Sequence, residues 1–528
     1  MDASLYAQIA AIAVLLLYAL AIFCALEAIL KTRTSQGAIA WTISLLTFPF
    51  LSVPLYLVLG RNKFHGYLEQ RDEIEAEALR LVQQTSGAIE QHIVQPSRDT
   101  PMYTSLLKLA RMPATTGNRV DLLINGEQTF DSIMAGLEAA QKYILFQFYI
   151  IRDDDLGRRL GRILADKARA GVEVYLLYDE IGSRPFVRSR LHKQLQVTGV
   201  HVAAFNTTQS GENGRRNRFQ FNFRNRFQLN FRNHRKVVVV DGETAWIGGH
   251  NVGIEYLGQG KKFDHWRDTH TRFQGPAVLG AEQAFATDWL WATRKTLKLD
   301  WDFRGQPKGD CTVLIFPSDP ASEFEEAGLM YHQAIVAARH KIWIASPYFV
   351  PDHSIVSALQ LAALRGVDVR VIVPKNPDKV IVGLANRSFT RDLLPAGVKV
   401  YRYENVEHQK AFMHQKVFIM DEEFSGVGTA NFDNRSFRLN FEITVLTQDA
   451  AFSGQVQKML QADLDHSREV DAREFEEPKE PEELKAKNRP RWRPKILYIR
   501  WWRFVIRYWR FHLFNLAMAI AKLFSPVL

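Results

Sequence analysis

The sequence predicts an α/β fold built from two similar halves, with a membrane hairpin before them and a basic amphipathic helix after them. Three observations support this prediction. A strand–helix–strand order occurs twice in the middle of the chain, which is typical of βαβ units and a mostly parallel sheet. Each half ends in the same motif of histidine, lysine, aspartate and asparagine. Two long charge-free runs precede the halves, and a stretch rich in arginine and aromatic residues follows them.

The composition fits a multidomain globular protein with an anionic partner. The chain has 528 residues, of which 47% are hydrophobic and 23% charged. It is therefore neither disordered as a whole nor a polytopic membrane protein. Two cysteines, Cys24 and Cys311, cannot form a disulfide framework or a cysteine-rich metal site. The formal net charge of +10 favours an acidic membrane surface or a nucleic acid as the partner.

The N-terminal runs are expected to anchor the chain in a membrane. Residues 3–26 carry no charge, and neither do residues 34–60. Because about 20 apolar residues cross a bilayer as a helix, we predict two transmembrane segments, at about 4–26 and 38–60. Asp2 and the length of the first run argue against a cleaved signal peptide. A pair of buried core helices is the other interpretation.

Two crossings would place the N-terminus and the main body on the same side of the membrane. The connecting loop carries Lys31 and Arg33, whereas the flank after the second run carries Arg61, Lys63 and Arg71. Positive charge is retained on the cytoplasmic side of membranes. The two-pass anchor is therefore expected to leave the body in the cytoplasm.

The C-terminal residues 485–528 form the other exceptional segment. They contain eleven Lys and Arg and no Asp or Glu, so the rest of the chain is nearly neutral. Arg500, Arg503, Arg507 and Arg510 recur every three or four residues among aromatic residues, which predicts one face of a helix. A basic, aromatic amphipathic helix is typical of the membrane interface, although the same charges would suit nucleic acid.

The middle of the chain is predicted to be a duplicated α/β unit. A strand at 143–151 precedes a helix at 156–170 and a second strand at 171–179, and the same order recurs between 341 and 373. Self-similarity on this scale indicates two copies of one domain rather than a solenoid. We therefore expect 1–62 to hold the two transmembrane segments, 63–118 to be a connecting helical region, 119–300 and 301–460 to be the two halves, 461–484 to be an acidic linker, and 485–528 to be the basic tail.

Each half ends in one polar motif with fixed spacing. The shared pattern is His-x-Lys-x4-Asp-x6-Gly-[Gly/Thr]-x-Asn. One short match would be a weak signal, but two copies with the same glycine and asparagine offsets are not plausibly chance. The motif residues are His234, Lys236, Asp241 and Asn251 in the first half, and His414, Lys416, Asp421 and Asn431 in the second.

These residue types suit a phosphodiester. Histidine and lysine two positions apart on a strand point to the same face, and pairing of the halves would bring both motifs together. The lysines and asparagines can grip phosphate oxygens in place of a metal. One histidine can attack phosphorus, and the other can protonate the leaving alkoxide. A nucleophilic imidazole needs its second nitrogen held by an acceptor, for which Asp268 and Glu442 are the candidates.

On these motifs the chain resembles the phospholipase D superfamily, named for its duplicated HKD motif, and within it the bacterial cardiolipin synthases. Similar features are the second charge-free run with Trp41 and Pro49, the segment 346–352, and the segment 431–442. The resemblance covers residues 1–460 and implies two pseudo-symmetric phospholipase D-like α/β/α sandwich halves that share one active site.

The resemblance implies transfer of a phosphatidyl group between two phosphatidylglycerol molecules in an anionic membrane, through a phosphohistidine, with neither metal nor cofactor. The products would be cardiolipin and glycerol. The superfamily's roles make His234 the nucleophile and His414 the acid, while the motif residues alone do not break this symmetry. Asp241 and Asp421 are counted with the catalytic set but look structural, set behind the site. No nucleic acid and no obligate protein partner is expected.

Two departures from the family pattern affect the first half. Gly249 stands where serine is commoner, and the acceptor expected for His234 is Asp268 rather than a glutamate. In addition, residues 218–225 are repeated as 226–233 directly before the motif. The first copy reads as an insertion, which would form either a solvated β extension or an arginine-rich loop that binds lipid headgroups.

Two other functions fit the same site. Hydrolysis, by a phospholipase D or a membrane-tethered nuclease, would share the covalent intermediate and use water in place of an alcohol. The basic tail would suit a nuclease, whereas the membrane segments suit a lipid better. A non-catalytic lipid-binding scaffold is the third function, but complete motifs in both halves argue against it.

Overall fold

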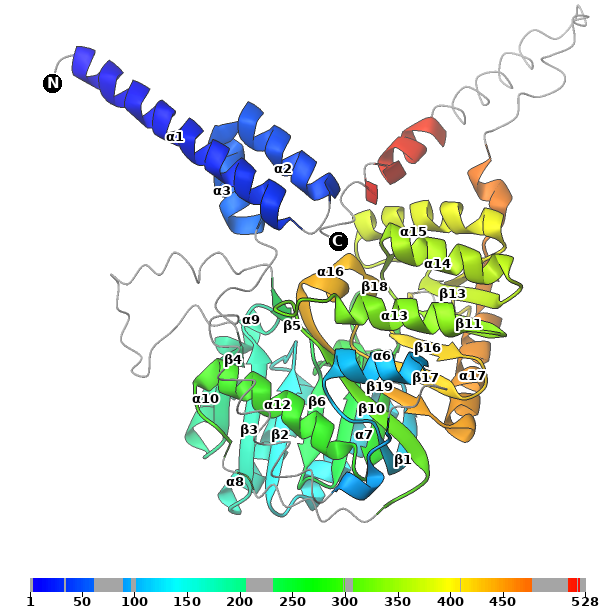
Figure 1. Cartoon of the computed structure of the whole chain (residues 1–528). Helices are drawn as coiled ribbons and strands as arrows, with labels where there is room; N and C mark the ends of the chain where they lie inside the picture. The colour runs from blue at the N-terminus through cyan, green and yellow to red at the C-terminus, as the bar shows by residue number, and fades with distance from the viewer. Residues whose placement is uncertain are drawn as a thin grey trace, which may run out of the picture.

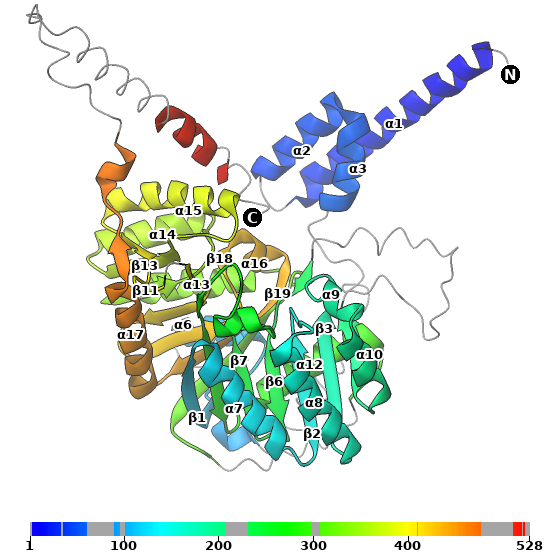
Figure 2. The same ribbon diagram turned by 180° about the vertical axis from the view of Figure 1, so that it is seen from behind.

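The computed structural model describes most of the chain. The described residues are 3–32, 35–60, 89–95, 101–205, 231–297, 299, 307–408, 410–476, 511–519 and 521–522. The N-terminal helices lie outside a body that contains the sheet, as Figures 1 and 2 show. The repeat before the first motif lies, apart from residues 231–233, outside the described residues.

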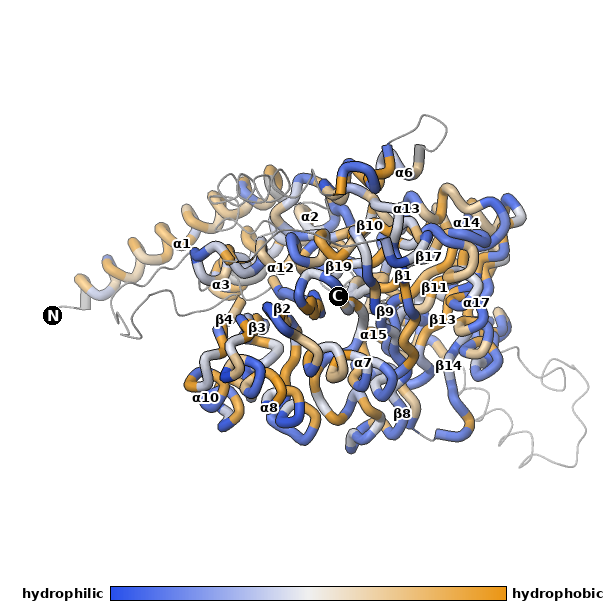
Figure 3. Tube along the Cα trace, turned by 90° about the horizontal axis from the view of Figure 1, so that it is seen from below, coloured by the Kyte–Doolittle hydropathy of each residue, from blue (hydrophilic) through white to orange (hydrophobic). Residues whose placement is uncertain are grey.

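The N-terminal charge-free runs form α1 (Ala3–Lys31), α2 (Ser35–Thr47) and α3 (Pro49–Leu59). Within the described residues, one helix is long and apolar enough to cross a membrane, at Leu5–Leu30 with a mean hydropathy of 2.9. Figure 3 shows α1 as mostly orange, the colour of hydrophobic residues. The second predicted segment is not one continuous helix but is divided at Phe48. The proline that follows begins a new helix, because its fixed φ and missing N–H suit a first helical position.

One continuous sheet runs through both halves. Within the described residues it contains sixteen strands, of which fifteen follow one continuous order and β5 (Arg232–Asn233) pairs beside that order. The central pair is β1 (Thr115–Ile124) and β10 (Cys311–Ser318), which run antiparallel. Outward from β1 lie β9 (Thr269–Gln274), β7 (Thr244–Gly248), β6 (Val237–Val240), β2 (Tyr143–Phe148), β3 (Glu173–Asp179) and β4 (His201–Phe205). Outward from β10 lie β19 (Asn440–Gln448), β17 (Phe424–Gly428), β16 (Val417–Met420), β11 (Lys341–Ala345), β13 (Asp368–Pro374), β14 (Lys399–Tyr403) and β20 (Ser467–Glu469). Corresponding strands thus follow the same order on both sides of the centre, which confirms the predicted duplication.

Helices cover both faces of this sheet. One core cluster extends through both halves beneath α12 (Val278–Thr293) and α17 (Ala450–Asp465). The opposite face is covered in the first half by α7 (Asn125–Ala139), α8 (Asp155–Arg169) and α10 (Arg190–Val197). In the second half it is covered by α6 (Pro101–Ala110), α13 (Glu326–Ala337), α14 (His353–Leu364) and α15 (Val380–Leu393). The mixed α/β fold with duplicated halves is therefore confirmed.

The alternation of side chains along β6 connects the two cores. Val237 and Val239 belong to the cluster under α12, whereas Val238 and Val240 belong to the cluster under α7 and α8. Successive side chains of a strand point to opposite faces, so a strand buried on both faces reads as an unbroken apolar run. The same holds for β16, which follows the second motif.

The prediction of a mostly parallel sheet is wrong. The pairs β2–β3–β4 and β11–β13–β14 are parallel, as their connecting helices require, but the strands around the motifs are antiparallel. The reason is local: β6 joins β7, and β16 joins β17, through turns too short for a crossover. Each half therefore combines a βαβ layer with a meander that carries the motif.

Shorter elements complete the body. They are β5 (Arg232–Asn233), β8 (His265–Arg267), β12 (Phe349–Val350), β15 (Ala411–Met413), β18 (Phe432–Asp433), α9 (Arg184–Val187) and α16 (Asn434–Arg438), with 3-10 turns at Glu90–His92, Ile254–Leu257, Leu394–Ala396 and Ala472–Phe475. The predicted acidic linker begins inside the body, because α17 ends at Asp465 and β20 pairs with β14. Residues 477–510, which include most of the predicted basic helix, lie outside the described residues.

Candidate active site

The two motif histidines stand in equivalent turns. His234 lies between β5 and β6, and His414 lies between β15 and β16. The lysine two residues later comes just before the strand, and both lysines are buried, with exposed fractions of 0% for Lys236 and 2% for Lys416. The four apolar residues that follow each lysine anchor the turn, because they pair on both sides within the sheet.

Each histidine is attached through its backbone to the opposite half. β5 pairs in parallel with the start of β19, and the His234 N–H donates to the carbonyl of Phe441 at 2.9 Å. In the same way β15 pairs in parallel with β8, and the His414 N–H donates to the carbonyl of Arg267 at 2.8 Å. The residue after each of these carbonyls therefore lies beside the histidine of the other half.

The orienting acids consequently cross between the halves. His234 Nδ1 lies 2.9 Å from Glu442 Oε2, and His414 Nδ1 lies 2.7 Å from Asp268 Oδ2. The expected pairing of Asp268 with His234 is therefore wrong. Along the chain each acid follows its own motif, but the parallel pairing of β5 with β19 and of β15 with β8 exchanges the partners.

Hydrogen bonds hold the two carboxylates in place. Thr429 Oγ1 donates to Glu442 Oε2 at 2.6 Å, and Asn440 Nδ2 donates to Glu442 Oε1 at 2.9 Å. The backbone N–H of Thr269 donates to Asp268 Oδ1 at 2.9 Å. Each carboxylate fixes its imidazole with the proton on Nδ1, so that Nε2 is the nitrogen left for chemistry.

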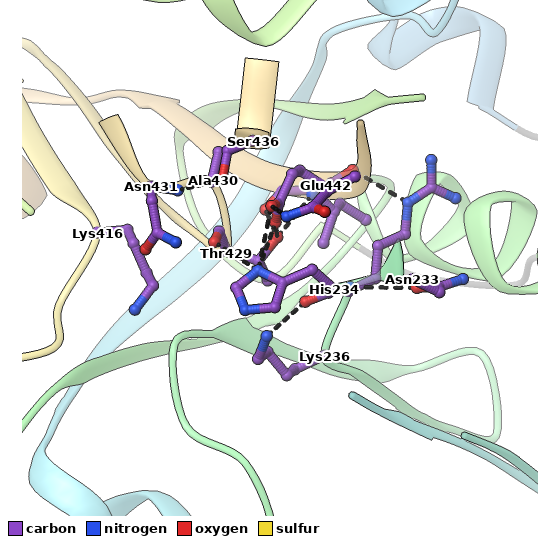
Figure 4. A network of polar contacts seen from close by, with 12 residues as sticks. Asn233, His234, Lys236, Lys416, Thr429, Ala430, Asn431, Ser436 and Glu442 are labelled. Atoms are coloured by element: carbon purple, nitrogen blue, oxygen red, sulfur yellow. Dashed lines mark hydrogen bonds and ion pairs between the residues drawn. The ribbon is translucent and has the colours of Figure 1, made fainter. Parts of the chain in front are cut away.

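The lysines and one asparagine surround the imidazole of His234, as Figure 4 shows. Lys236 Nζ donates to the carbonyl of His234 at 2.5 Å. Lys416 Nζ lies 3.1 Å from His414 Nε2, and its charge also acts on His234. In the same view Asn431 lies beside Lys416. The structure therefore brings both motifs to one place, as the sequence predicts.

The two motif asparagines differ in their contacts. Asn251 Oδ1 accepts from the backbone N–H of Ile150 at 3.1 Å, and Asn251 Nδ2 donates to Tyr256 Oη at 3.3 Å. Asn431 Oδ1 is buried with no hydrogen-bond partner among the described residues. A buried amide without a partner is costly, so Asn431 is the asparagine more available to an incoming polar group.

Burial and the lysines keep both imidazoles neutral. Burial and then Lys236, against the opposing effect of Glu442, lower the pKa of His234 to about 4. Burial and then Lys416 lower the pKa of His414 to about 3. Burial also lowers the pKa of Lys416 to about 8. At neutral pH the site thus combines neutral, nucleophilic imidazoles with a cation for a phosphate.

The orienting acids stay ionised in spite of their burial. Burial alone would raise the pKa of Asp268, but Lys416 and His414 outweigh it and lower the pKa. Burial likewise opposes ionisation of Glu442, and His234 and Lys236 lower its pKa overall. Within the described residues, no group of three or more His, Cys, Asp and Glu is arranged to hold a metal ion.

The motif aspartates shape turns. The Asp241 carboxylate accepts from the backbone N–H groups of residues 141–143 at 2.7, 2.7 and 2.9 Å. The Asp421 carboxylate accepts from residues 339–341 in the same way. Both aspartates are left-handed, with φ of 55° and 51°. Their oxygens cap the loop that leads into β2 or β11, which favours the structural role over a place in the catalytic set.

Replacing Asp241 by Ala is expected to lower the free energy of unfolding by about 3 kcal/mol. Backbone donors lose their acceptor, and alanine is strained in a left-handed conformation. Asp241→Asn keeps one oxygen and tolerates that backbone, so a loss of about 1 kcal/mol is expected. Urea unfolding of both variants in detergent checks the difference. Equal losses would contradict the capping role.

Gly249 is required by the orienting acid beside it. A Cβ at this position would lie 2.0 Å from Asp268 Oδ1. The equivalent residue of the second half is Thr429, whose hydroxyl instead donates to Glu442. Gly249 thus lies beside Asp268, whereas Thr429 lies beside the longer Glu442. This close packing explains why position 249 is glycine although serine is commoner there in the family.

Gly249→Ala is expected to lower kcat by about 100-fold, the scale that a displacement of about 1 Å carries in an active site. The added methyl would push Asp268 away from His414. Gly454→Ala serves as the control, because a Cβ there meets no atom within 4 Å and alanine favours a helix. Comparable kcat values for the two variants would contradict the steric argument.

Two aromatic side chains beside the histidines were not predicted. The Tyr149 ring lies 5.1 Å from the ring of His234, and the Trp266 ring lies 5.0 Å from that of His414. Lys236 Nζ also lies 5.4 Å from the centre of the Tyr149 ring. Trp266 stands two residues before Asp268, so the alternation of β8 could have indicated it. Tyr149 has no such signal, because only the tertiary structure brings the end of β2 to His234.

Comparison with known proteins agrees with this architecture. The family model described as "Cardiolipin synthase, PLD-like domain" matches residues 133–262 and 331–464. A second model, described as "Phospholipase D-nuclease N-terminal", matches residues 19–61. The first model therefore matches each half once, and each match includes one HKD motif.

Curated relatives resemble nearly the whole chain. Cardiolipin synthase A of Pseudomonas entomophila is 43% identical over 460 residues, which cover 87% of this chain and 92% of the relative. Cardiolipin synthase A of Pseudomonas aeruginosa strain LESB58 is 43% identical over 449 residues, with coverage of 84% and 88%.

A solved structure shares the fold. Phosphatidylserine synthase of Haemophilus influenzae superposes with a TM-score of 0.55 at 15% identity, and the match covers 82% of this chain and all of that one. At this identity the likeness concerns the fold alone. The two family-model matches and the curated relatives confirm the predicted resemblance: the chain belongs to the cardiolipin synthase family of the phospholipase D superfamily.

Proposed function

We propose that this enzyme transfers a phosphatidyl group from one phosphatidylglycerol to the headgroup hydroxyl of another, which yields cardiolipin and glycerol. The observation that carries the proposal is the pair of crossed imidazole–carboxylate contacts, each beside a buried lysine. The names of the relatives, cardiolipin synthase A, support the choice of reaction.

In the first step, His234 Nε2 would attack phosphorus, and the bond from phosphorus to the glycerol headgroup oxygen would break. The electron pair of that bond goes to the leaving oxygen, which takes a proton from His414 Nε2. Glu442 would stabilise the positive charge that forms on the His234 ring. The result is a phosphatidyl group bound to His234 and a free glycerol.

In the second step, the hydroxyl of a second phosphatidylglycerol would give its proton to His414 and attack phosphorus. The phosphorus–nitrogen bond breaks, its electron pair returns to His234, and cardiolipin leaves. Lys236, Lys416 and Asn431 would hold the non-bridging oxygens, whose negative charge grows in both transition states. Asn251, the asparagine of the first motif, would fix the segment after β2 by accepting a hydrogen bond from the backbone N–H of Ile150.

The protonation of His414, the proposed acid, would depend on substrate binding. Burial and Lys416 lower the pKa of His414 to about 3. A phosphodiester anion between the two lysines would offset their charges, and Asp268 already favours the protonated ring. His414 would thus gain its proton when the substrate binds.

The substrate and the anchor together place the reaction at a membrane. We propose that α1 crosses a bacterial cell membrane and that α2 and α3 together return the chain to the same side, with the body in the cytoplasm. The exposed apolar side chains of α1, such as Leu15 at 69% and Leu16 at 66%, support contact with lipid. Anionic phospholipid would be the substrate, with no nucleic acid involved.

Product analysis tests this function directly. Purified protein is supplied with phosphatidylglycerol in mixed micelles, without added metal, and lipids and glycerol are measured. Cardiolipin and glycerol in equal amounts are expected. Phosphatidic acid as the only lipid product would mean that water resolves the intermediate, and the transferase proposal would then be wrong.

The rate should fall at alkaline pH. Lys416, with a pKa of about 8, is charged below that pH and loses its charge above it. Because kcat/KM reports groups of the free enzyme, including the acid His414 with its low pKa, kcat/KM is expected to fall already at neutral pH and to fall more steeply as pH rises through about 8, where Lys416 loses its charge. His234 stays unprotonated down to about pH 4, so the acidic limb should lie below pH 5. A profile that is flat up to pH 10 would contradict the role of Lys416.

A further inference from the structure

The buried Arg235 links the first histidine's acid to the helix behind it. Arg235 Nε donates to the backbone carbonyl of Glu442 at 3.0 Å, and Arg235 Nη2 donates to the carbonyl of Ser318 at 3.1 Å. Its Nη1 forms an ion pair with Asp288 Oδ1 of α12 at 2.8 Å, where the two side chains are 5% and 0% exposed. The Arg235 guanidinium therefore connects the first residues of β19 to α12.

The buried Arg267 makes the corresponding link for the second histidine. Arg267 Nη1 donates to the backbone carbonyl of Asp268 at 2.8 Å. Its Nε and Nη2 donate to the two oxygens of Asp463 on α17, at 2.7 and 2.9 Å. The two side chains are 5% and 6% exposed. In both cases an arginine holds the carbonyl of the residue whose carboxylate binds a catalytic imidazole.

The anchoring carboxylates are themselves held. Asp288 Oδ2 accepts from Gln147 Nε2 and from Asn233 Nδ2, both at 2.7 Å. Asp463 Oδ2 accepts from Gln415 Nε2 at 2.7 Å. Asn233 and Gln415 are the direct neighbours of His234 and His414 in the chain. Each network therefore ties a motif, its helix and the opposite acid into one rigid unit.

The two arginines come from positions that are not equivalent in the repeat. Arg235 lies inside the first motif, where the second motif has Gln415. Arg267 precedes the first acid, where the second half has Phe441 before Glu442. Each half therefore has an arginine that donates to the carbonyl of an orienting acid, but the two arginines stand at different positions of the repeat. Buried ion pairs are poor stabilisers compared with apolar side chains of the same size, so stability alone is a weak reason for both.

We propose that Arg235–Asp288 and Arg267–Asp463 are positioning pairs for the reaction. They set the direction of Glu442 and Asp268, and so aim the free nitrogen of each imidazole at phosphorus. The inference rests on the proposed transfer reaction. It assigns the first pair to the nucleophile and the second pair to the general acid.

A change of leaving group separates the two roles. Arg235→Lys, Asp288→Asn, Arg267→Lys and Asp463→Asn are compared on phosphatidylglycerol and on phosphatidyl-p-nitrophenol. Each variant is expected to lose about 10–100-fold in kcat on phosphatidylglycerol, with KM nearly unchanged. p-Nitrophenolate leaves without a proton, so the Arg267 and Asp463 variants should recover the rate of the first step on that substrate, measured as the initial burst of p-nitrophenolate before His414 is needed as a base. The Arg235 and Asp288 variants should stay slow, because they impair the attack itself.

A matched control is Arg272→Gln. Arg272 pairs with Asp121 at 3.2 Å on the neighbouring strands β9 and β1. The kcat of the Arg272→Gln variant on both substrates should equal that of the wild type. Thermal unfolding in detergent shows how much of each variant is folded. Each pair offers two variants, and failure of both variants of a pair to fold would mean that its role is structural.

Failure of the positioning role and failure of the proposed reaction would give different results. Equal losses on both substrates by all four variants, or full activity in all four, would overturn the positioning role. Recovery of the Arg235 pair in place of the Arg267 pair would support positioning and exchange the roles of the two histidines. If wild-type protein made no cardiolipin from phosphatidylglycerol, the proposed function would fail, whatever the variants do.

Discussion

The His234→Ala variant is expected to lose cardiolipin formation by about 10⁶-fold in kcat, the scale at which loss of a nucleophile acts in another covalent mechanism. Glu442 holds His234 Nδ1 and the Tyr149 ring lies against the imidazole, so His234 Nε2 is the nitrogen that the structure leaves for the attack. Substrate binding should persist, since Lys416 and Asn431 remain.

His414→Ala is the matched comparison for this prediction. Loss of a general acid lowers kcat by about 10²–10⁴-fold, and it does so only when the leaving group needs a proton. Both variants are supplied with phosphatidyl-p-nitrophenol labelled in its phosphate, and the protein is denatured in alkali, in which a phosphorus–nitrogen bond survives. With a good leaving group, label should remain on His414→Ala and be absent from His234→Ala. The reverse pattern would show that the two histidines have exchanged roles.

Glu442→Gln is expected to cost about 10⁴-fold in kcat, as removal of the orienting charge does in a serine protease triad. The amide can turn its NH2 group toward His234 Nδ1 and favour the wrong tautomer. It also removes the negative charge that stabilises the imidazolium. KM should change little, because the lysines that bind phosphate are not altered.

Thr429→Ala provides a graded control for this second prediction. It removes the hydroxyl that donates to Glu442 Oε2 at 2.6 Å but leaves the carboxylate and its contact with His234. Loss of one such bond is worth about 1 kcal/mol, so roughly a fivefold fall in kcat is expected. The kinetic constants of both variants are measured with unfolding midpoints. A Glu442→Gln variant with nearly normal kcat would mean that the crossed contact has no part in the reaction.

The residues of the site could be predicted from the sequence because their signal is local and occurs twice. His-x-Lys on a strand, followed by four apolar residues, places both polar side chains on one face and buries the backbone behind them. Repetition at equal spacing then predicts that two such turns meet. The resemblance alone implied that Asp241 and Asp421 look structural, and the observed hydrogen bonds to backbone N–H groups supply a physical basis for that role.

The partners of these residues could not be predicted from the sequence. Asp268 follows the first motif and Glu442 follows the second, so proximity along the chain favours pairing within each half. The parallel bridges of β5 with β19 and of β15 with β8 reverse that assignment. Arg235 and Arg267 have no signal at all, since each acts through a helix that lies far away in sequence.

The sequence by itself determined that this protein has two α/β halves, an apolar N-terminal helix and a duplicated phosphodiester motif. These features depend on periodicity, charge and spacing over a few neighbouring residues. Only the tertiary structure decided which acid serves which histidine and why position 249 is glycine. Those outcomes depend on strand exchange between halves and on contacts of a few ångströms between distant segments, which no local pattern records.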